Sequence, residues 1–245
     1  MTPARVSSAA GSLWFASSWW AASKGEGRVA PMTVRCVEVY PDAVHLQGFL
    51  SLEAQRRLAE QCHVIGTGPV GWYVPTVRGR GKMRVEMVCL GYHWNARTYR
   101  YQATRDDHDG RPVPALPADL SELAREMAVA AGTAVEPDVC ILNYYGPAGK
   151  MGLHQDKDER PETLEAGLPI VSVSLGDTAK FIIGGFTRAE PKTMVPLASG
   201  DGFVFGGRSR LRYHGVAAIL PGTGPATLGL EGRYNLTFRQ GAASQ

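Results

Sequence analysis

The amino-acid sequence predicts an α+β, mainly β fold: a two-sheet jelly-roll barrel with helices packed on one side. The chain contains 29 Gly and 16 Pro in 245 residues, which indicates many turns and a body rich in strands. Two segments in the first part of the chain have the periodicity of amphipathic helices. After residue 138 the chain consists of short strand-like segments separated by turn signals, and this order of elements favours a jelly roll.

Composition narrows the class of protein. Hydrophobic residues make up 44% of the chain and charged residues 20%, which is typical of a globule with a buried core. The net charge of +3 neither requires nor opposes a nucleic-acid partner. No apolar run approaches the ~20 residues of a bilayer span, so a transmembrane protein is excluded and no membrane partner is expected. The four cysteines form no CxxC motif, which favours reduced, partly buried thiols and a cytoplasmic location.

Local patterns predict the elements in order. Residues 1–31, rich in Ala, Ser and Gly, are expected to be a loosely ordered extension before a single domain at 32–245. A first helix is expected behind a Ser51 cap, and a second begins at Asp119, with Glu122 at its third position, and stops at Gly132. Between the helices lie a loop or loose hairpin at 64–81, a strand at 83–89 and an aromatic-basic segment at 92–101. Six more strands are expected at 139–145, 170–175, 180–183, 202–206, 213–217 and 233–239.

Two histidines and one aspartate have the spacing of a metal site. In His154-Gln155-Asp156 the imidazole and the carboxylate are two residues apart, so an extended chain points both to one face. His214 follows in a later strand-like segment and can add a second nitrogen. Two His and one carboxylate suit a non-haem Fe(II) oxygenase, because they leave adjacent coordination positions open. The same donors bind zinc in hydrolases, and an HxD pattern can also be a plain surface feature, so the alternatives stay open.

The C-terminal segment 233–239 alternates strictly between polar and apolar residues. Arg233, Asn235 and Arg239 are expected on one face of this strand, together with Thr237. That face can be a solvated edge. It also suits a small dianion, because arginine binds a carboxylate through a bidentate fork. A 2-oxo dicarboxylic acid can chelate iron at one end and bind such an arginine at the other, and two residues that alternate in the same sense can complete the pocket: Asn143 and Tyr145.

Several motifs occur in a fixed order along the chain: 143–147, 153–159, 169–176, 206–210, 213–215 and 233–239. Together they resemble the AlkB family of Fe(II)- and 2-oxoglutarate-dependent dioxygenases, which repair alkylated nucleobases. The resemblance implies a double-stranded β-helix core at 138–240 and a nucleotide-recognition lid at 66–110. It also implies ligands for Fe(II), namely His154, Asp156 and His214, and for 2-oxoglutarate, namely Asn143, Tyr145, Arg233, Asn235 and Arg239, with O2 as the second cosubstrate.

The resemblance further implies a substrate. N-alkyl groups of the 1-methyladenine or 3-methylcytosine type are removed from single- or double-stranded DNA, or from RNA, with release of formaldehyde, succinate and CO2. A duplex base must be flipped out and stacked on an aromatic ring, for which Trp94 is the candidate, flanked by Tyr99 and Tyr101. Asp158 is implied for the exocyclic amino group, and Arg188 is a further expected substrate contact. Without the resemblance, Trp94 can be an ordinary core residue and Asp158 a solvated turn acid.

Two other classes of function stay open from the sequence. The same chemistry can act on tRNA, on a protein or on a small molecule. A jelly-roll module can also bind a metal or a sugar without catalysis, because one fold supports many functions. The chain is expected to be a monomer.

Overall fold

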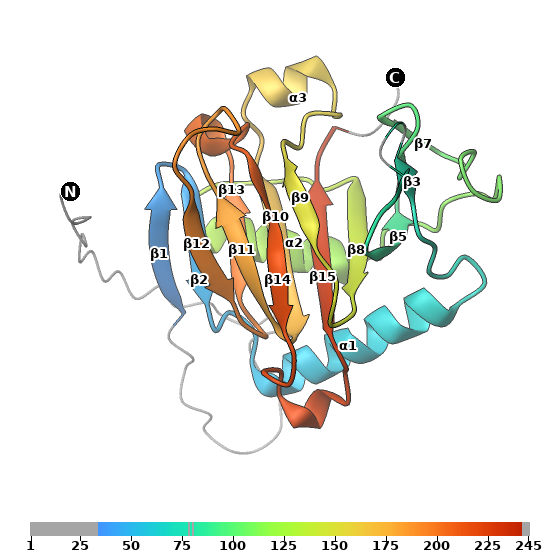
Figure 1. Cartoon of the computed structure of the whole chain (residues 1–245), viewed down its shortest axis with the longest axis horizontal. Coiled ribbons are helices and arrows are strands. Elements are labelled where there is room, and N and C mark those ends of the chain that lie inside the picture. The colour runs from blue at the N-terminus through green and yellow to red at the C-terminus, as the bar shows by residue number, and fades with distance from the viewer. Residues whose placement is uncertain (1–33, 78, 80, 242–245) are drawn as a thin grey trace.

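The computed structural model describes residues 34–77, 79 and 81–241. Two β-sheets face each other, and α1 and α2 lie behind the larger one (Figure 1). The predicted jelly-roll core with helices on one side is therefore confirmed. The extension expected at residues 1–31 lies outside the described residues. None of the helices in the described ranges is both long and apolar enough to cross a bilayer.

The larger sheet has seven strands, and each neighbouring pair is antiparallel. In spatial order the strands are β1 (Arg35–Tyr40), β2 (Ala43–Gln47), β13 (Gly202–Phe205), β10 (Ile170–Gly176), β15 (Arg233–Arg239), β8 (Val139–Tyr145) and β5 (Glu86–Leu90). The sheet thus takes in three strands that precede the core expected at 138–240.

The smaller sheet has four antiparallel strands that cover one face of the larger sheet. In spatial order they are β12 (Thr193–Leu197), β11 (Thr178–Ile183), β14 (His214–Leu220) and β9 (Met151–His154). Two short hairpins stand beside the edge strand β5: β3 (Thr76–Val77) with β4 (Gly81–Lys82), and β6 (His93–Asn95) with β7 (Arg100–Gln102).

The helices pack on the outer face of the larger sheet through the apolar stripes that the sequence pattern predicts. The helix α1 (Leu52–Thr67) begins behind Ser51, whose Oγ accepts a hydrogen bond from the Ala54 amide at 3.2 Å, so the predicted cap is confirmed. The second helix, α2 (Ala118–Ala130), buries residues such as Leu120, Leu123 and Met127. A short helix, α3 (Pro161–Glu165), follows β9 in the chain.

Two apolar cores result from this layering. One lies between the helices and the larger sheet, and the other lies between the two sheets. The strand β15 contributes to the helix-side core through Tyr234, Leu236 and Phe238. Because side chains alternate along a strand, the polar residues of β15 face the space between the sheets.

Three local expectations differ from the structure. The helix α2 begins one residue earlier than expected, and Pro117 occupies the cap position without a side-chain cap. The Asp119 carboxylate, in the first turn of the helix, accepts a hydrogen bond from the Gln61 side chain at 3.0 Å, so the expected start of the helix at Asp119 is wrong. The first helix runs through Thr67 and so extends into the segment 64–81 that was expected to be a loop or loose hairpin. The four cysteines are free, but three of them are buried and Cys36 is exposed.

Candidate active site

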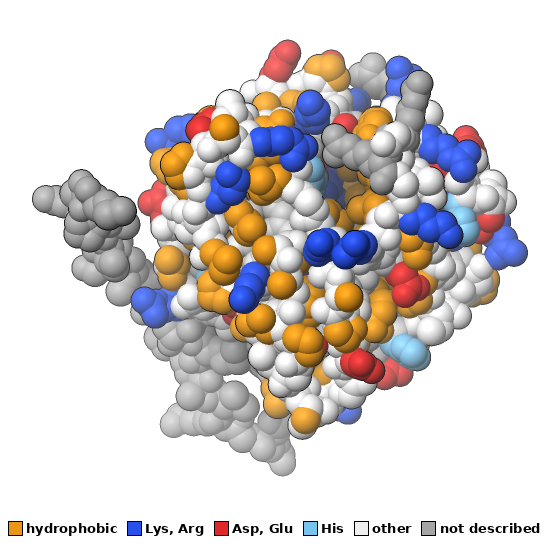
Figure 2. Space-filling view, in the orientation of Figure 1, with side chains coloured by type: hydrophobic (Ala, Val, Ile, Leu, Met, Phe, Trp, Pro, Cys, Tyr) orange, Lys and Arg blue, Asp and Glu red, His pale blue; other side chains and the backbone are white. Residues whose placement is uncertain are grey.

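A cavity of about 950 Å³ opens between the two sheets beside the hairpins. Figure 2 shows it as a hollow with Lys and Arg side chains on its rim. Every residue that the sequence predicted for the site lines this one cavity, from Trp94 near the hairpins to Arg239 at the end of β15. The structure therefore brings together side chains that lie far apart in the sequence. Their individual roles remain predictions.

The His-Asp-His triad converges at one place in the cavity. His154 ends β9 and His214 begins β14, and the two residues are direct cross-strand partners. Asp156 follows β9, with its carboxylate 3.5 Å from His154 Nε2 and 3.6 Å from His214 Nε2. One ligand atom from each of the three residues lies within 4.8 Å of the other two. This spacing suits a single ion held by two nitrogens and one oxygen.

Hydrogen bonds orient both imidazoles. His154 Nδ1 lies 2.9 Å from the Gly152 carbonyl oxygen, and His214 Nδ1 lies 3.0 Å from the Arg212 carbonyl oxygen. A carbonyl oxygen only accepts, so each Nδ1 donates and each Nε2 is left with its lone pair toward Asp156. These residues therefore fit a bound metal.

Opposing effects set the charge of the triad. Burial alone would raise the pKa of Asp156, but Arg239 and the two histidines outweigh it and hold that pKa well below the usual range. Burial lowers the pKa of His214, assisted by His154. An ionised carboxylate beside a neutral imidazole is the protonation state that a divalent cation needs in its ligands.

Two neighbouring strands present the polar side chains that the sequence predicted for a keto acid. The register between β15 and β8 pairs Arg233 with Tyr145 and Asn235 with Asn143. Partners on one face of an antiparallel pair lie side by side, so four of the predicted residues form one cluster. All four are at least 93% buried. The predicted alternation of β15 is confirmed.

Arg233 is a buried cation that has no carboxylate partner among the described residues. It is 1% exposed, and its guanidinium carbon lies 5.2 Å from the centroid of the Tyr145 ring. Its Nη2 donates to Ser174 Oγ at 2.9 Å, whereas Nε and Nη1 have no hydrogen-bond partner among the described residues. Burial lowers its pKa to about 10, and Tyr145 offsets this only in part. A second unsatisfied group, Asn143 Oδ1, is buried in the same cluster.

Arg239, by contrast, has two carboxylates beside it. Its Nη2 donates to Asp156 Oδ2 at 2.7 Å, and its Nε lies 3.2 Å from the Glu159 carboxylate. Burial alone would lower the pKa of Arg239, but the attraction of Asp156, then of Tyr101 and Glu159, outweighs it and raises that pKa. Arg239 thus connects the predicted metal-ligand triad to the face of β15 that carries the residues predicted for 2-oxoglutarate.

A second ion pair supports this connection and was missed by the sequence analysis. Arg210 Nη2 lies 3.0 Å from Glu159 Oε2, and both side chains are at least 98% buried. Arg210 also donates to the carbonyl oxygens of Leu168 and Asp156, which fixes the chain next to the metal ligand. The pattern around Glu159 is a run of charged residues, and such a run carries no signal that separates a buried acid from a solvated one.

The residues predicted for the substrate lie on the lid side of the cavity. Trp94, on β6, is half-buried, and its Nε1 donates to Asp158 Oδ2 at 2.8 Å. Burial raises the pKa of Asp158, and the hydrogen bond from Trp94 opposes this. Tyr99 meets the Trp94 ring edge-on at 6.0 Å, and Tyr101 is the cross-strand partner of Trp94. The structure thus pairs Trp94 with Asp158, and the roles expected for both residues remain predictions.

Arg188 lies apart from these aromatic residues. It is exposed on the β11–β12 loop, donates to the Leu153 carbonyl oxygen and places its guanidinium 4.9 Å from the centre of the Tyr213 ring. It lines the cavity together with the metal-ligand triad. Its guanidinium is therefore held by contacts with β9 and with Tyr213.

Comparison with known proteins agrees with this geometry. The family model described as the 2OG-Fe(II) oxygenase superfamily matches residues 42–239. Alpha-ketoglutarate-dependent dioxygenase AlkB of Salmonella typhimurium is 41% identical over 208 residues, covering 84% of this chain and 93% of that protein. DNA N(6)-methyladenine demethylase ALKBH1C of Arabidopsis thaliana is 37% identical over 223 residues, covering 82% of this chain and 49% of that protein.

The chain thus spans about half the length of its Arabidopsis relative and nearly all of its Salmonella relative. A solved structure titled "The structure of OsALKBH1" superposes with a TM-score of 0.80 at 37% identity, covering 84% of this chain and all of that one. The family model covers most of the chain, including the His-Asp-His triad and the strand β15. The chain belongs to the AlkB family of Fe(II)- and 2-oxoglutarate-dependent dioxygenases.

Proposed function

We propose that this protein is an oxidative demethylase that removes N-alkyl groups from bases of DNA or RNA, of the 1-methyladenine or 3-methylcytosine type. The products are the repaired base, formaldehyde, succinate and CO2. Relatives carry names that describe DNA demethylases and nucleic acid dioxygenases, which supports a nucleic-acid substrate. The Lys and Arg side chains on the rim of the cavity are consistent with a polyanionic partner.

The observation that carries the proposal is the uncompensated guanidinium of Arg233 in the same cavity as the triad. A buried charge is costly unless it is paired, so this position calls for an anion. In our assignment the distal carboxylate of 2-oxoglutarate binds Arg233 and Tyr145, with the amides of Asn143 and Asn235 beside it. Arg239 then holds the Asp156 carboxylate in place, and it contacts the keto-acid end of the cosubstrate.

His154, Asp156 and His214 are assigned as the ligands of Fe(II). When bound, the ion couples the oxidative decarboxylation of 2-oxoglutarate by O2 to hydroxylation of an N-methyl group, whose hydroxymethyl product then leaves as formaldehyde. The protein supplies the rest: Nδ1 hydrogen bonds hold the imidazoles in place, and apolar residues that line the cavity, such as Phe181 and Phe205, exclude water.

The lid side is assigned to the base. Trp94 stacks on the flipped base, Tyr99 and Tyr101 contact the backbone beside it, and Arg188 binds a phosphate. Asp158 accepts a hydrogen bond from the exocyclic amino group through Oδ1, because Trp94 already occupies Oδ2. A carboxylate at this position favours bases that carry a positive charge, such as 1-methyladenine and 3-methylcytosine.

Formaldehyde release tests the proposal directly. The purified protein is incubated with matched DNA and RNA oligonucleotides that contain 3-methylcytosine, with and without added Fe(II) and 2-oxoglutarate. We expect release that requires both additions and that is lost in the Asp156→Ala variant. Succinate formation without demethylation of any oligonucleotide would contradict a nucleic-acid substrate and would favour a protein or a small molecule.

A second candidate substrate is N6-methyladenine in DNA, since two Arabidopsis relatives at 37% identity are named for it. This base is neutral and keeps one exocyclic N–H. Its methyl group replaces one of the two N–H groups through which an unmodified amino group can donate a hydrogen bond to Asp158. The same assay with an N6-methyladenine oligonucleotide separates the two: faster turnover of that oligonucleotide than of 3-methylcytosine would overturn the assignment of a cationic lesion.

A further inference from the structure

A buried histidine–aspartate pair lies behind the tryptophan assigned to base stacking. His93 precedes Trp94 on β6, so its side chain projects to the opposite face of the hairpin. His93 Nε2 lies 2.5 Å from Asp107 Oδ1, and the two side chains are 0% and 3% exposed. Neither residue lines the cavity. The pair therefore does not belong to the site assigned above, although it is one residue away from it in the sequence.

Asp107 holds the backbone on both sides of Trp94. Its Oδ1 binds the imidazole of His93, one residue before the tryptophan. Its Oδ2 accepts a hydrogen bond from the Ala96 amide at 2.9 Å, two residues after the tryptophan. One carboxylate thus spans the stretch of β6 that carries the indole. A shift of the Asp107 carboxylate therefore affects its contacts with His93 and with the Ala96 amide together.

The loop that carries Asp107 is itself tied to the larger sheet through Tyr73. The rings of His93 and His108 lie 5.5 and 4.8 Å from the Tyr73 ring, and the Arg105 guanidinium lies 4.9 Å from it. The Tyr73 backbone exchanges two hydrogen bonds with Met87 of β5, at 3.1 and 2.8 Å. The anchor of Trp94 therefore continues from Asp107 to a strand of the core.

On the cavity side the indole donates from Nε1 to Asp158 and meets the Tyr99 ring edge-on. These contacts touch one edge and one side of the ring, so its height and tilt also depend on the backbone that carries it. We propose that Asp107, acting through His93 and the Ala96 amide, is a positioning residue that sets Trp94 for stacking and so determines the affinity for the alkylated base. This inference rests on the proposed function, because it requires Trp94 to stack on a base.

The test replaces Asp107 by Asn, which keeps the shape of the side chain and removes one of its two acceptor oxygens. We measure KM and kcat with a 3-methylcytosine oligonucleotide, the Kd of that oligonucleotide, and the Kd of 2-oxoglutarate with Mn(II) as an unreactive metal. Small misplacements of positioning groups cost up to about 100-fold, so KM and the oligonucleotide Kd should rise by about 10- to 100-fold. The kcat and the Kd of 2-oxoglutarate should stay as in the wild type.

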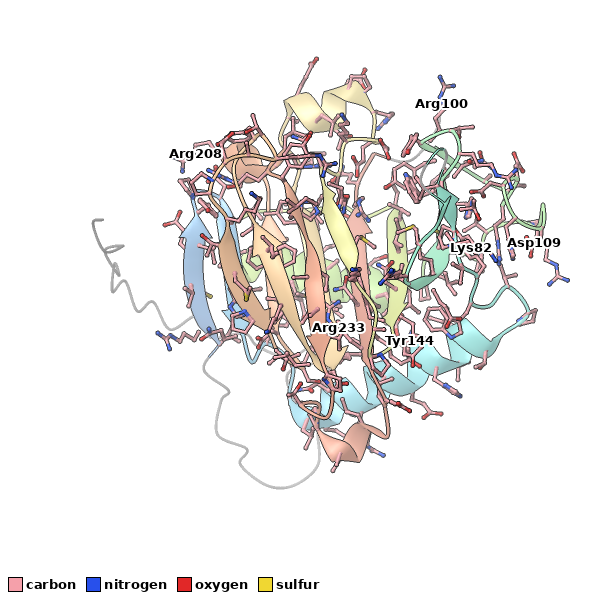
Figure 3. All side chains as sticks on the ribbon, in the orientation of Figure 1. Lys82, Arg100, Asp109, Tyr144, Arg208 and Arg233 are labelled. Carbon is pink, nitrogen blue, oxygen red and sulfur yellow. The ribbon has the colours of Figure 1, made fainter. Side chains whose placement is uncertain are left out.

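The matched control is Asp106→Asn. Asp106 is the exposed neighbour of Asp107 and accepts a hydrogen bond only from the Thr104 hydroxyl among the described residues. The Asp106→Asn variant should leave the KM, the kcat and the two Kd values unchanged. His93→Gln serves as the second variant if Asp107→Asn does not fold, and it should raise KM in the same way. Asp109, at the outer end of the same loop, shows how far this loop extends from the core (Figure 3).

A double-mutant cycle separates positioning from general stabilisation. If Asp107 acts through Trp94, adding Asp107→Asn to Trp94→Ala should raise KM no further, because the ring that it positions is gone. An additive effect in the double mutant would overturn the inference, and so would an unchanged KM in the single variant. A wild-type protein that demethylates no oligonucleotide would overturn the proposed function together with this inference, whereas an active wild type with an unaffected Asp107→Asn variant would overturn the inference alone.

Discussion

Two arginines of β15 illustrate what burial means at the scale of a residue. Arg233 and Arg239 lie on one face of the strand, and both are at least 93% buried. Arg239 has two carboxylates within 3.2 Å, whereas Arg233 has none among the described residues. The sequence pattern places them alike. The structure separates them into a residue that stabilises the site and a residue that destabilises the protein until an anion binds.

This difference predicts opposite effects of the same substitution. A pKa lowered from 12.5 to about 10 means that keeping Arg233 charged costs the folded state about 3 kcal/mol below pH 10. Arg233→Met should therefore leave the melting temperature unchanged or raise it in the absence of ligand. The KM for 2-oxoglutarate should rise by roughly 100-fold, since a buried ion pair with the cosubstrate is lost. Thermal unfolding and steady-state kinetics check the two parts separately.

Arg239→Met is the matched contrast. It removes the partner of two buried carboxylates, and breaking such a pair costs about 3–5 kcal/mol. Its melting temperature should fall clearly below that of the wild type. If both variants lose stability to the same extent, Arg233 has an anion in the protein as it is, and the assignment of the 2-oxoglutarate carboxylate to this residue is wrong.

Metal binding gives another prediction for single residues. A ligand that binds only the folded state stabilises it by mass action, so Mn(II) should raise the melting temperature of the wild type. His214→Ala removes one nitrogen of the triad and should abolish most of this rise. His45→Ala is a control, because this histidine is buried at a distance from the triad and binds Asp201. A rise that persists in His214→Ala would show that Mn(II) binds elsewhere.

At the scale of an element, the β6–β7 hairpin should be sensitive to pH through His93. Burial lowers the pKa of His93 below 6.5, and Asp107 only partly opposes this, while Arg105 and His108 assist it and Tyr73 packs beside the ring. As the pH falls below about 6.5, the unfolded chain takes up the proton before the folded one does. The folded state therefore loses stability over this range, down to the folded pKa.

The variant His93→Gln cannot take up this proton. Its melting temperature should therefore fall less than that of the wild type between about pH 7.5 and about pH 5. His63→Gln, on the exposed side of α1, is the control for a general effect of removing a histidine. Equal slopes for wild type and His93→Gln would contradict the idea that burial disfavours the charged form of His93.

The elements also show what the sequence could predict. The bounds of β8 and β15 agree with those expected, because both strands have turn signals at each end. The strands β1, β2, β9 and β12 were not expected. The strand β9 has four residues, and its pairing with β14 depends on a partner more than 50 residues away, which no local pattern carries. The triad was predictable because His154 and Asp156 are only two residues apart, so their pattern is visible in the local sequence. The third member, His214, stands in a segment that was itself expected to be a strand.

The parts of the site that could not be predicted depend on the tertiary structure. The buried pair of Glu159 and Arg210 joins two loops that are distant in sequence. The pair of His93 and Asp107 is closer in sequence, but it depends on how the lid folds back on Tyr73. Charged residues at these positions have the same appearance in the sequence as solvated ones. Burial alone distinguishes them, and burial is a property of the packed molecule.

At the scale of the whole molecule, the larger sheet separates two apolar cores, of which one supports stability alone and the other also supports the site. Among the described residues, the helix-side core contains no residue of the triad, whereas the core between the sheets continues into the wall of the cavity. A substitution in the helix-side core should therefore change stability and leave the site intact. Leu123, on α2, is fully buried in that core, and Leu123→Ala should cost about 2–5 kcal/mol.

Phe181 provides the comparison on the other side of the sheet. Its ring lies 4.9 Å from the ring of Phe203 and 6.0 Å from the ring of the ligand His214, and it lines the cavity. Phe181→Ala should cost about 3–5 kcal/mol and should also raise the KM for 2-oxoglutarate, because the space it leaves lets His214 move and admits water. The kinetic constants are measured well below both melting temperatures and are divided by the folded fraction. If the KM changes equally in Leu123→Ala and Phe181→Ala, the larger sheet transmits strain from one core to the other. A rigid larger sheet would instead confine the effect of Leu123→Ala to stability.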